Sequence, residues 1–421
     1  MKHILFLING FTVRSGNYIF TASIISKLFS FLGSWIALII LPDKELGLAI
    51  FAFNIISFII PLGGLGAQQS LLRYGSFLST NTEKINLYNF TLKKGFKGSI
   101  YLILIVIVLS PIFTYTLNSA LLYLILFSFS ILSYFLFDNL KIKYRIINNN
   151  KMFAKMDIVF SSIQVISILL LSYYFGVFGY VIAIIIAPLA TFLIFLMKDK
   201  KNKSEEIISF NFCDKEFRKY GFFASLANVA TQLLFAIDIF LIGFLLINPA
   251  LITHYKYVSI IPFSLLILPN ILISTDFVTI TENISNKFFV KNYIKSFMIL
   301  FSIMSAIIFG ILFIFGKSIL NIFGPIYVEY YHLFIILTIG VIGILILRSL
   351  FGNLLSSIGK AHINYWIAIS CLVLNVVLNF NLIPKYGILG AGITSAIIMW
   401  FSGFLSLILF IYYYKKFLKG F

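Results

Sequence analysis

The stretch Tyr18–Pro42 reads YIFTASIISKLFSFLGSWIALIILP and contains a single charged residue, Lys27. About 20 consecutive apolar residues are enough for a helix to cross the hydrocarbon core of a bilayer. A lysine inside such a span costs roughly 2.5–3.5 kcal/mol on insertion scales, so it normally faces a bundle interior or a hydrated cavity. The stretch therefore predicts a membrane helix whose ammonium group suits an anionic cargo.

The rest of the chain has the same apolar character. Its 421 residues are 61% hydrophobic and only 11% charged, whereas soluble domains average about 25% charged residues. This composition is typical of a polytopic membrane protein, and the long apolar runs favour helices over the short alternating strands of a β-barrel. The net charge of +18 would suggest nucleic-acid binding in a soluble protein. Here we expect no nucleic-acid partner, because the position of each charge matters more than the sum.

Hydropathy divides the chain into about twelve candidate spans, each near the length that a bilayer requires. The predicted spans are Tyr18–Leu41, Leu46–Ala67, Ser99–Leu117, Ala120–Leu140, Met156–Phe175, Gly179–Met197, Tyr220–Ile247, Tyr257–Ile280, Ser296–Phe315, Tyr330–Leu350, Ile363–Ile383 and Leu389–Tyr414.

When the N-terminus is placed in the cytoplasm, nearly all of the basic residues fall in cytoplasmic segments. Of the 32 lysines and arginines, only Lys44, Lys256, Lys317 and Lys385 then fall in outside loops, with Lys27 inside a span. This distribution follows the positive-inside rule. We expect a multi-pass protein of the cytoplasmic (inner) membrane with both termini in the cytoplasm.

The longest polar stretch divides the spans into six before and six after. Residues 198–219 predict a cytoplasmic linker, with one six-helix lobe in residues 1–197 and a second in residues 220–421. Paired halves of this kind are a common transporter plan, with the substrate bound between them. The predicted fold is therefore an all-α integral membrane protein with two six-helix lobes around a central cavity.

The sequence offers nothing that indicates an enzyme. It has no glycine-rich phosphate loop of the Walker type, its four histidines are scattered, and the predicted outside loops are short. We therefore expect no catalytic residue, no cofactor and no metal site. A membrane polymerase or acyltransferase stays as a rival reading, and so does a structural scaffold.

Charged residues within the spans are the candidates for function. Lys27 is the first choice for contacting a phosphate, as a point charge in a low-dielectric cavity. Asp238, in the seventh span, could bind a coupling ion, either a proton or Na⁺, or act in gating. The alternative is an ion pair between Lys27 and Asp238 that locks the lobes.

Two amides precede Asp238 on the same predicted helix. Asn228 and Gln232 are four residues apart and share a face with which Asp238 is nearly aligned. This polar stripe predicts a water-lined wall that contacts cargo. Hydrogen bonding across a helix–helix interface is an equally good interpretation.

Arg73 and Arg348 lie close to predicted span ends. A basic side chain in that position commonly extends to the membrane interface. Contact with cargo is the alternative that makes both arginines candidate substrate-binding residues.

Several stretches resemble a known family. They are Pro61–Gly66 (PLGGLG) with Ser70–Tyr74 (SLLRY), Ala236-Ile237-Asp238, Phe323-Gly324, Ile358-Gly359-Lys360, the pair Asn375 and Asn379, Leu382–Gly392 (LIPKYGILGAG) and Thr394. Together they resemble the polysaccharide-exporter, or O-antigen flippase, branch of the superfamily that also contains multidrug antiporters and lipid II flippases.

The resemblance implies a V-shaped pair of six-helix lobes and a cargo of undecaprenyl-pyrophosphate-linked oligosaccharide. It implies that cavity basic residues hold the pyrophosphate, a role that Lys27 could fill. We therefore expect a flippase that works by alternating access in O-antigen or capsule assembly, with membrane lipid and polysaccharide polymerase machinery as further partners. The alternative function is a cation-coupled multidrug or metabolite exporter of the same fold.

Overall fold

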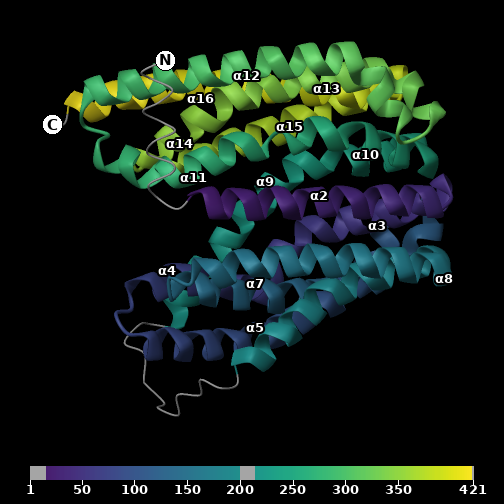
Figure 1. Ribbon diagram of the computed structural model, residues 1–421, viewed down its shortest axis with the longest axis horizontal. Coiled ribbons are helices and arrows are strands. Elements are labelled where there is room, and N and C mark those ends of the chain that lie inside the picture. The colour runs from purple at the N-terminus through teal and green to yellow at the C-terminus, as the bar shows by residue number, and fades with distance from the viewer. Residues whose placement is uncertain (1–15, 200–213, 420–421) are drawn as a thin grey trace. The chain divides into compact units, whose positions relative to one another are not determined.

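Every regular element that the computed structural model describes is a helix or a helical turn (Figure 1). The structure describes residues 16–199 and 214–419. The prediction of an all-helical membrane protein is confirmed. The helices group into two units by their contacts. The N-terminal unit contains Thr21–Ala236 and Ile247–Thr253, and the C-terminal unit consists mainly of Ile237–Leu246 and His254–Phe421.

The N-terminal unit is built from long helices broken by short irregular turns. Its elements are α2 (Gly16–Ile40), α3 (Asp43–Ile59), the 3₁₀ segment η1 (Ile60–Gly66), α4 (Ala67–Phe77), α5 (Asn81–Phe113), η2 (Asn118–Ala120), α6 (Leu121–Ser128), α7 (Ser130–Ile146), α8 (Asn150–Asp199) and the first part of α9 (Asp214–Leu246).

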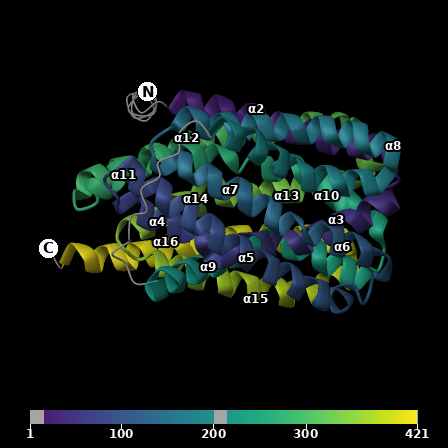
Figure 2. The same ribbon diagram turned by 90° about the horizontal axis from the view of Figure 1, so that it is seen from below.

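The C-terminal unit begins with the end of α9. It continues with α10 (Pro249–Ser264), α11 (Ile267–Glu282), α12 (Lys287–Asn321), η3 (Pro325–Tyr330), α13 (Tyr331–Gly343), η4 (Ile344–Arg348), α14 (Ser349–Ser357), α15 (Ala361–Tyr386) and α16 (Ile388–Lys419). Both views show α13 and α14 running along α16 (Figures 1 and 2).

Ten helical segments of the described residues are long and apolar enough to cross a membrane. Among them α8 counts once, although Gly176 divides it at the junction of the predicted fifth and sixth spans. The predicted seventh span falls on α9, of which only Ile237–Leu246 is counted, as a shorter apolar helix. The helices thus agree with the prediction of about twelve spans in two lobes. The exact boundaries of the two lobes stay a prediction, and most of the linker predicted at 198–219 lies outside the described residues.

The third and ninth spans are longer than hydropathy predicts. Helix α5 begins at Asn81, well before the predicted Ser99, because Thr80 and Glu83 form a capping box at its start. Helix α12 begins at Lys287, where the Asn286 side chain accepts hydrogen bonds from the next backbone N–H groups. Hydropathy detects only the part of a helix that lies in hydrocarbon, so it misses such polar extensions.

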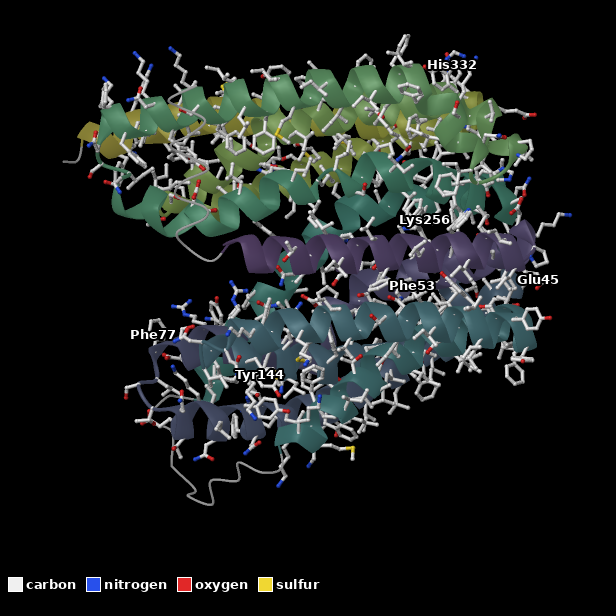
Figure 3. The ribbon with its side chains drawn as sticks, viewed as in Figure 1. Glu45, Phe53, Phe77, Tyr144, Lys256 and His332 are labelled. Atoms are coloured by element: carbon white, nitrogen blue, oxygen red, sulfur yellow. The ribbon has the colours of Figure 1, made fainter. Side chains whose placement is uncertain are left out.

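Two successive connections of the N-terminal unit lie at its opposite ends. Figure 3 places Glu45, just after the α2–α3 turn, and Phe77, at the end of α4, at opposite ends of the N-terminal unit. This alternation is what helices that cross a membrane in turn require. It agrees with a multi-pass membrane protein.

Both units contain the same glycine turn between two antiparallel helical arms. Gly176 (φ 59°, ψ −140°) bends α8, and Gly387 (φ 59°, ψ −141°) joins α15 to α16. Three residues later, a Cβ at Gly179 would lie 1.8 Å from the Leu171 oxygen, and one at Gly390 would lie 2.3 Å from the Leu382 oxygen. The backbone angles and the three-residue spacing of the two glycines are the same in both units.

We expect Gly176→Ala and Gly387→Ala each to lower the free energy of unfolding by about 1–3 kcal/mol, because a non-glycine residue adopts this backbone conformation only under strain. The matched control is Gly310→Ala within α12, where a Cβ meets nothing within 4 Å. That variant should be as stable as the parent or slightly more so. Thermal unfolding in detergent measures the difference, and equal midpoints for G387A and G310A would contradict the assignment.

Candidate functional site

The carboxylate of Asp238 lies at the centre of a buried polar cluster in the C-terminal unit. Its Oδ1 accepts hydrogen bonds from the side-chain amides of Asn375 (3.1 Å) and Asn379 (2.9 Å). Its Oδ2 accepts hydrogen bonds from the hydroxyls of Tyr255 (2.9 Å) and Ser395. Asp238 is only 1% exposed, so the surrounding protein provides all the solvation that this carboxylate has.

The four donors fit an ionised carboxylate. An ionised carboxylate is a pure acceptor, and each oxygen can receive two hydrogen bonds. All four recorded donors are neutral, and no lysine or arginine in the described part of the C-terminal unit pairs with Asp238. In its ionised form the cluster carries a net negative charge, which a bound cation or a proton would balance.

Two further oxygens of the same helices are buried without a hydrogen-bond partner. They are Oδ1 of Asn379 and Oγ1 of Thr394. Uncompensated buried acceptors of this kind are costly. A carboxylate together with amide and hydroxyl oxygens is a donor set that suits a hard cation. With a single carboxylate, the set matches a monovalent ion or a proton better than a divalent metal.

Local sequence places each member of the cluster. Asn375 and Asn379 are four residues apart on α15, so their amides share one face, and the Asn379 amide also donates to Oδ1 of Asn375 at 2.7 Å. Thr394 and Ser395 lie just beyond the Gly387 turn, which brings the first turns of α16 back alongside α15. The cluster therefore depends on the tight connection between the last two helices.

Lys27 lies on α2 in the N-terminal unit, and its side chain is exposed. No carboxylate in the described part of that unit pairs with it. The window of α2 that is long enough to span the membrane is only 17% buried, less than that of any other candidate span. A charge on so exposed a helix is compatible with a hydrated surface. The predicted role of Lys27, and its alternative pairing with Asp238 in the other unit, both stay predictions.

The other candidates of the N-terminal unit are Arg73, Asn228 and Gln232. The Arg73 guanidinium lies 4.3 Å from the ring centroid of Tyr220, at the beginning of α9. Asn228 is exposed further along α9. The side chain of Gln232 lies outside the described residues. Their assignment to cargo contact remains a prediction.

Arg348 belongs to a second polar cluster of the C-terminal unit. Its Nη1 donates to Oδ1 of Asn364 (2.8 Å) and to Oγ of Ser406 (2.7 Å). The guanidinium is thus held between α14, α15 and α16, although a residue near a span end was expected to reach the interface. The Arg348 cluster shares no hydrogen-bond partner with the Asp238 cluster.

Sequence reasoning missed an ion pair in the N-terminal unit. The Lys141 Nζ lies 2.5 Å from Oδ1 of Asp157, and Asp138 stands one turn before Lys141 on α7. Both aspartates fall inside predicted spans, so they should have been counted among the intramembrane charges. Tyr255, Asn375, Asn379 and Ser395 were also missed as partners of Asp238. The four-residue spacing of the two asparagines was the only local signal for them.

Comparison with known proteins supports the transporter fold. No protein-family model matches the chain. A capsular polysaccharide biosynthesis protein, CapF of Staphylococcus aureus, is 37% identical over 103 residues, which is 24% of this chain and 24% of that protein. The sequence match is therefore local.

The structural likeness extends over the whole fold. An inward-facing multidrug resistance transporter of the MATE family superposes with a TM-score of 0.75 at 12% identity, covering 93% of this chain and 96% of that one. The lipid II flippase MurJ, in an inward closed conformation, gives a TM-score of 0.70 at 20% identity, covering 95% and 89%. The chain therefore has the fold of the MOP superfamily of membrane transporters, and it is a multi-pass membrane protein.

Proposed function

We propose that the protein is a flippase for undecaprenyl-pyrophosphate-linked oligosaccharide repeat units. It moves them across the cytoplasmic membrane by alternating access, for O-antigen or capsule assembly. The observation that carries the proposal is Lys27, an exposed cation within a membrane-spanning helix of a transporter fold, with no carboxylate paired to it in the described part of its own unit. The local likeness to a capsular polysaccharide biosynthesis protein supports a glycan cargo.

The charge of the head group explains why a protein is required. Moving a charged, hydroxyl-rich group through hydrocarbon without compensating contacts is prohibitive. In the proposed mechanism, the ammonium of Lys27 offsets the pyrophosphate charge, with Arg73 and Arg348 as further cationic contacts and with Asn228 and Gln232 along a hydrated wall. The lipid tail stays in the bilayer, and polymerase machinery receives the repeat unit outside.

Asp238 supplies the proposed coupling ion site. A proton or Na⁺ bound there would neutralise the buried carboxylate, and the partnerless Oδ1 of Asn379 belongs to an amide that already contacts this carboxylate. Asp238 lies on α9 just after Ala236, where the chain passes from the N-terminal to the C-terminal unit. Ion binding at this position can therefore influence the helix that connects the two units.

The second candidate function is a cation-coupled multidrug or metabolite exporter. The MATE-family likeness and the Asp238 cluster favour it. The two functions differ in the charge of the cargo: an exporter of organic cations needs an acidic binding surface, whereas Lys27 suits an anion.

Deleting the chain from a cell that makes the glycan separates the two functions. We expect surface polysaccharide to disappear and undecaprenyl-linked repeat units to accumulate inside, since the uncatalysed crossing is too slow. The measurements are glycan immunoblots and mass spectrometry of extracted lipids. An unchanged surface glycan together with increased sensitivity to ethidium would favour the exporter instead. Turnover of the lipid-linked sugar by purified protein would favour an enzyme.

A further inference from the structure

The tenth span is interrupted where it reaches Arg348. Helix α13 ends at Gly343, and the segment η4, Ile344–Arg348, is a π-helical turn before α14 begins at Ser349. Such turns are rare, and they are frequently found at functional sites. The wider turn rotates Arg348 about the helix axis away from the position that it would have in a regular α-helix.

Close packing against α16 fixes the surroundings of this turn. A Cβ at Gly340 would lie 2.7 Å from the Ala396 Cα, and a Cβ at Gly403 would lie 2.9 Å from the Leu347 Cβ. Small residues at membrane helix contacts allow backbones to approach in this way. Because the two helices are held in register, Ser406 meets the Arg348 guanidinium one turn further along α16.

The guanidinium is oriented through one of its nitrogens. Nη1 makes both hydrogen bonds, to Asn364 and Ser406. The Asn364 amide is itself fixed, because its Nδ2 donates to the Gly352 oxygen (2.7 Å) and to the Ser356 hydroxyl (3.0 Å). A Cβ at Gly352 would lie 3.1 Å from Nη1, so the absence of a side chain there leaves room for the arginine.

The remaining donors of Arg348 stay available. Its Nε and Nη2 make no hydrogen bond to the described residues, yet they are not among the fully buried polar atoms. No carboxylate in the described part of the C-terminal unit pairs with the guanidinium. Arg348 is therefore a positioned guanidinium whose Nε and Nη2 donors are not used by the described residues.

Arg348 also lies deep along its helix. Nine residues separate it from Ser357, the end of α14, which corresponds to roughly 13 Å of helix. Arg348 belongs to the candidate membrane span Pro325–Ser357, and a charge inside such a span is expensive unless a partner compensates it. The planar edge of a guanidinium matches the oxygens of a phosphate in a two-point hydrogen bond.

We propose that Arg348, positioned by Asn364 and Ser406, is a binding site for a lipid-borne phosphate group. Two sources share this chemistry. One is the pyrophosphate of the cargo, in which case the inference rests on the proposed function and deepens it by saying how Asn364 and Ser406 position Arg348 for that contact. The other is an anionic phospholipid of the membrane, which would need no cargo at all.

The test is a lipid titration of the purified full-length protein in detergent, followed by native mass spectrometry. The probes are undecaprenyl pyrophosphate, phosphatidylglycerol and, as a phosphate-free control, diacylglycerol. We expect R348Q to weaken binding of the phosphate lipid by roughly 10- to 100-fold, because a charge-assisted contact is lost. R348K should lose less affinity for the phosphate lipid, since lysine keeps the positive charge but lacks the planar two-point donor geometry of the guanidinium. Diacylglycerol binding should not change.

Asn364→Asp provides a second variant that does not remove the arginine. It places a carboxylate against Nη1, so the guanidinium is neutralised from within the protein. We expect phosphate-lipid binding to fall as it does in R348Q. The thermal midpoint should also fall, because the aspartate cannot donate to the Gly352 oxygen as the Asn364 Nδ2 does, so binding is measured at a temperature at which the variant is folded. The matched control is Lys385→Gln, an exposed basic residue near the end of α15, which should change binding less than about twofold.

The pattern of losses identifies the source of the phosphate. Loss of undecaprenyl pyrophosphate alone supports a cargo contact, loss of phosphatidylglycerol alone supports a membrane-lipid site, and loss of both supports a general phosphate site. Parent-like binding of both lipids by R348Q and N364D would overturn the inference. That result would leave the flippase proposal standing, because the deletion phenotype tests it separately.

Discussion

Asp238→Asn is expected to abolish ion-coupled transport while leaving the protein folded. The substitution removes the single negative charge of the cluster, and a loss of about 3 kcal/mol of ion attraction corresponds to a roughly hundredfold weaker cation affinity. The fold should survive, because the asparagine oxygen can still accept from Asn375 and Asn379, and the hydroxyls of Tyr255 and Ser395 can rotate to accept from its amide.

Thermal stability provides the direct measurement of ion binding. A ligand present at a hundred times its Kd stabilises the folded state by about 2.7 kcal/mol. We therefore expect Na⁺, compared with choline at equal ionic strength, to raise the unfolding midpoint of the parent but not of D238N. A shift that follows pH rather than Na⁺ would identify the proton as the coupling ion.

The C-terminal unit offers a matched control for Asp238. Asp276 is also buried, at 5% exposure, and accepts a hydrogen bond from the Tyr293 hydroxyl at 3.2 Å. D276N should keep the ion-dependent shift, because the paired asparagines on α15 surround Asp238 and not Asp276. If D238N keeps both the shift and transport, or if D276N loses them equally, the ion site is assigned to the wrong residue.

Lys27→Ala is expected to reduce surface glycan to the level of a deletion strain without reducing the amount of protein in the membrane. Losing a charge-assisted contact to the pyrophosphate lowers affinity roughly 10- to 100-fold. Insertion of the helix should be easier rather than harder, because the cost of placing an ammonium in hydrocarbon disappears. Glycan immunoblots and membrane-fraction blots measure the two quantities.

Two control variants and a labelling experiment make the Lys27 test more specific. Lys27→Arg keeps the charge and should retain partial activity, and Lys44→Ala, at an exposed lysine in the first turn of α3, should have no effect. A cysteine introduced at position 27, with Cys213 and Cys371 replaced by serine, should react with a water-soluble maleimide. Full complementation by K27A, or a position 27 that is sealed from water on both sides, would refute the assignment.

Local sequence was enough to predict the helices and the connections between them. The apolar run around Lys27 predicts α2, and the predicted span boundaries leave short connections at 176–178 and 384–388, where the structure has turns at Gly176 and Gly387. It failed where polar segments extend a helix, as at the start of α5, and where acids near span ends, Asp138 and Asp157, were overlooked among the neighbouring lysines.

By itself, the sequence determined that this chain crosses the membrane repeatedly and carries a few charges within its spans. That conclusion is local, because transfer of about 20 apolar residues into hydrocarbon depends on those residues alone. Only the tertiary structure decided which groups surround the charges. Asn375 and Ser395 meet Asp238 across 137 and 157 residues of sequence, and Ser406 meets Arg348 across 58. These contacts depend on how helices pack and turn, which hydropathy along one segment does not encode.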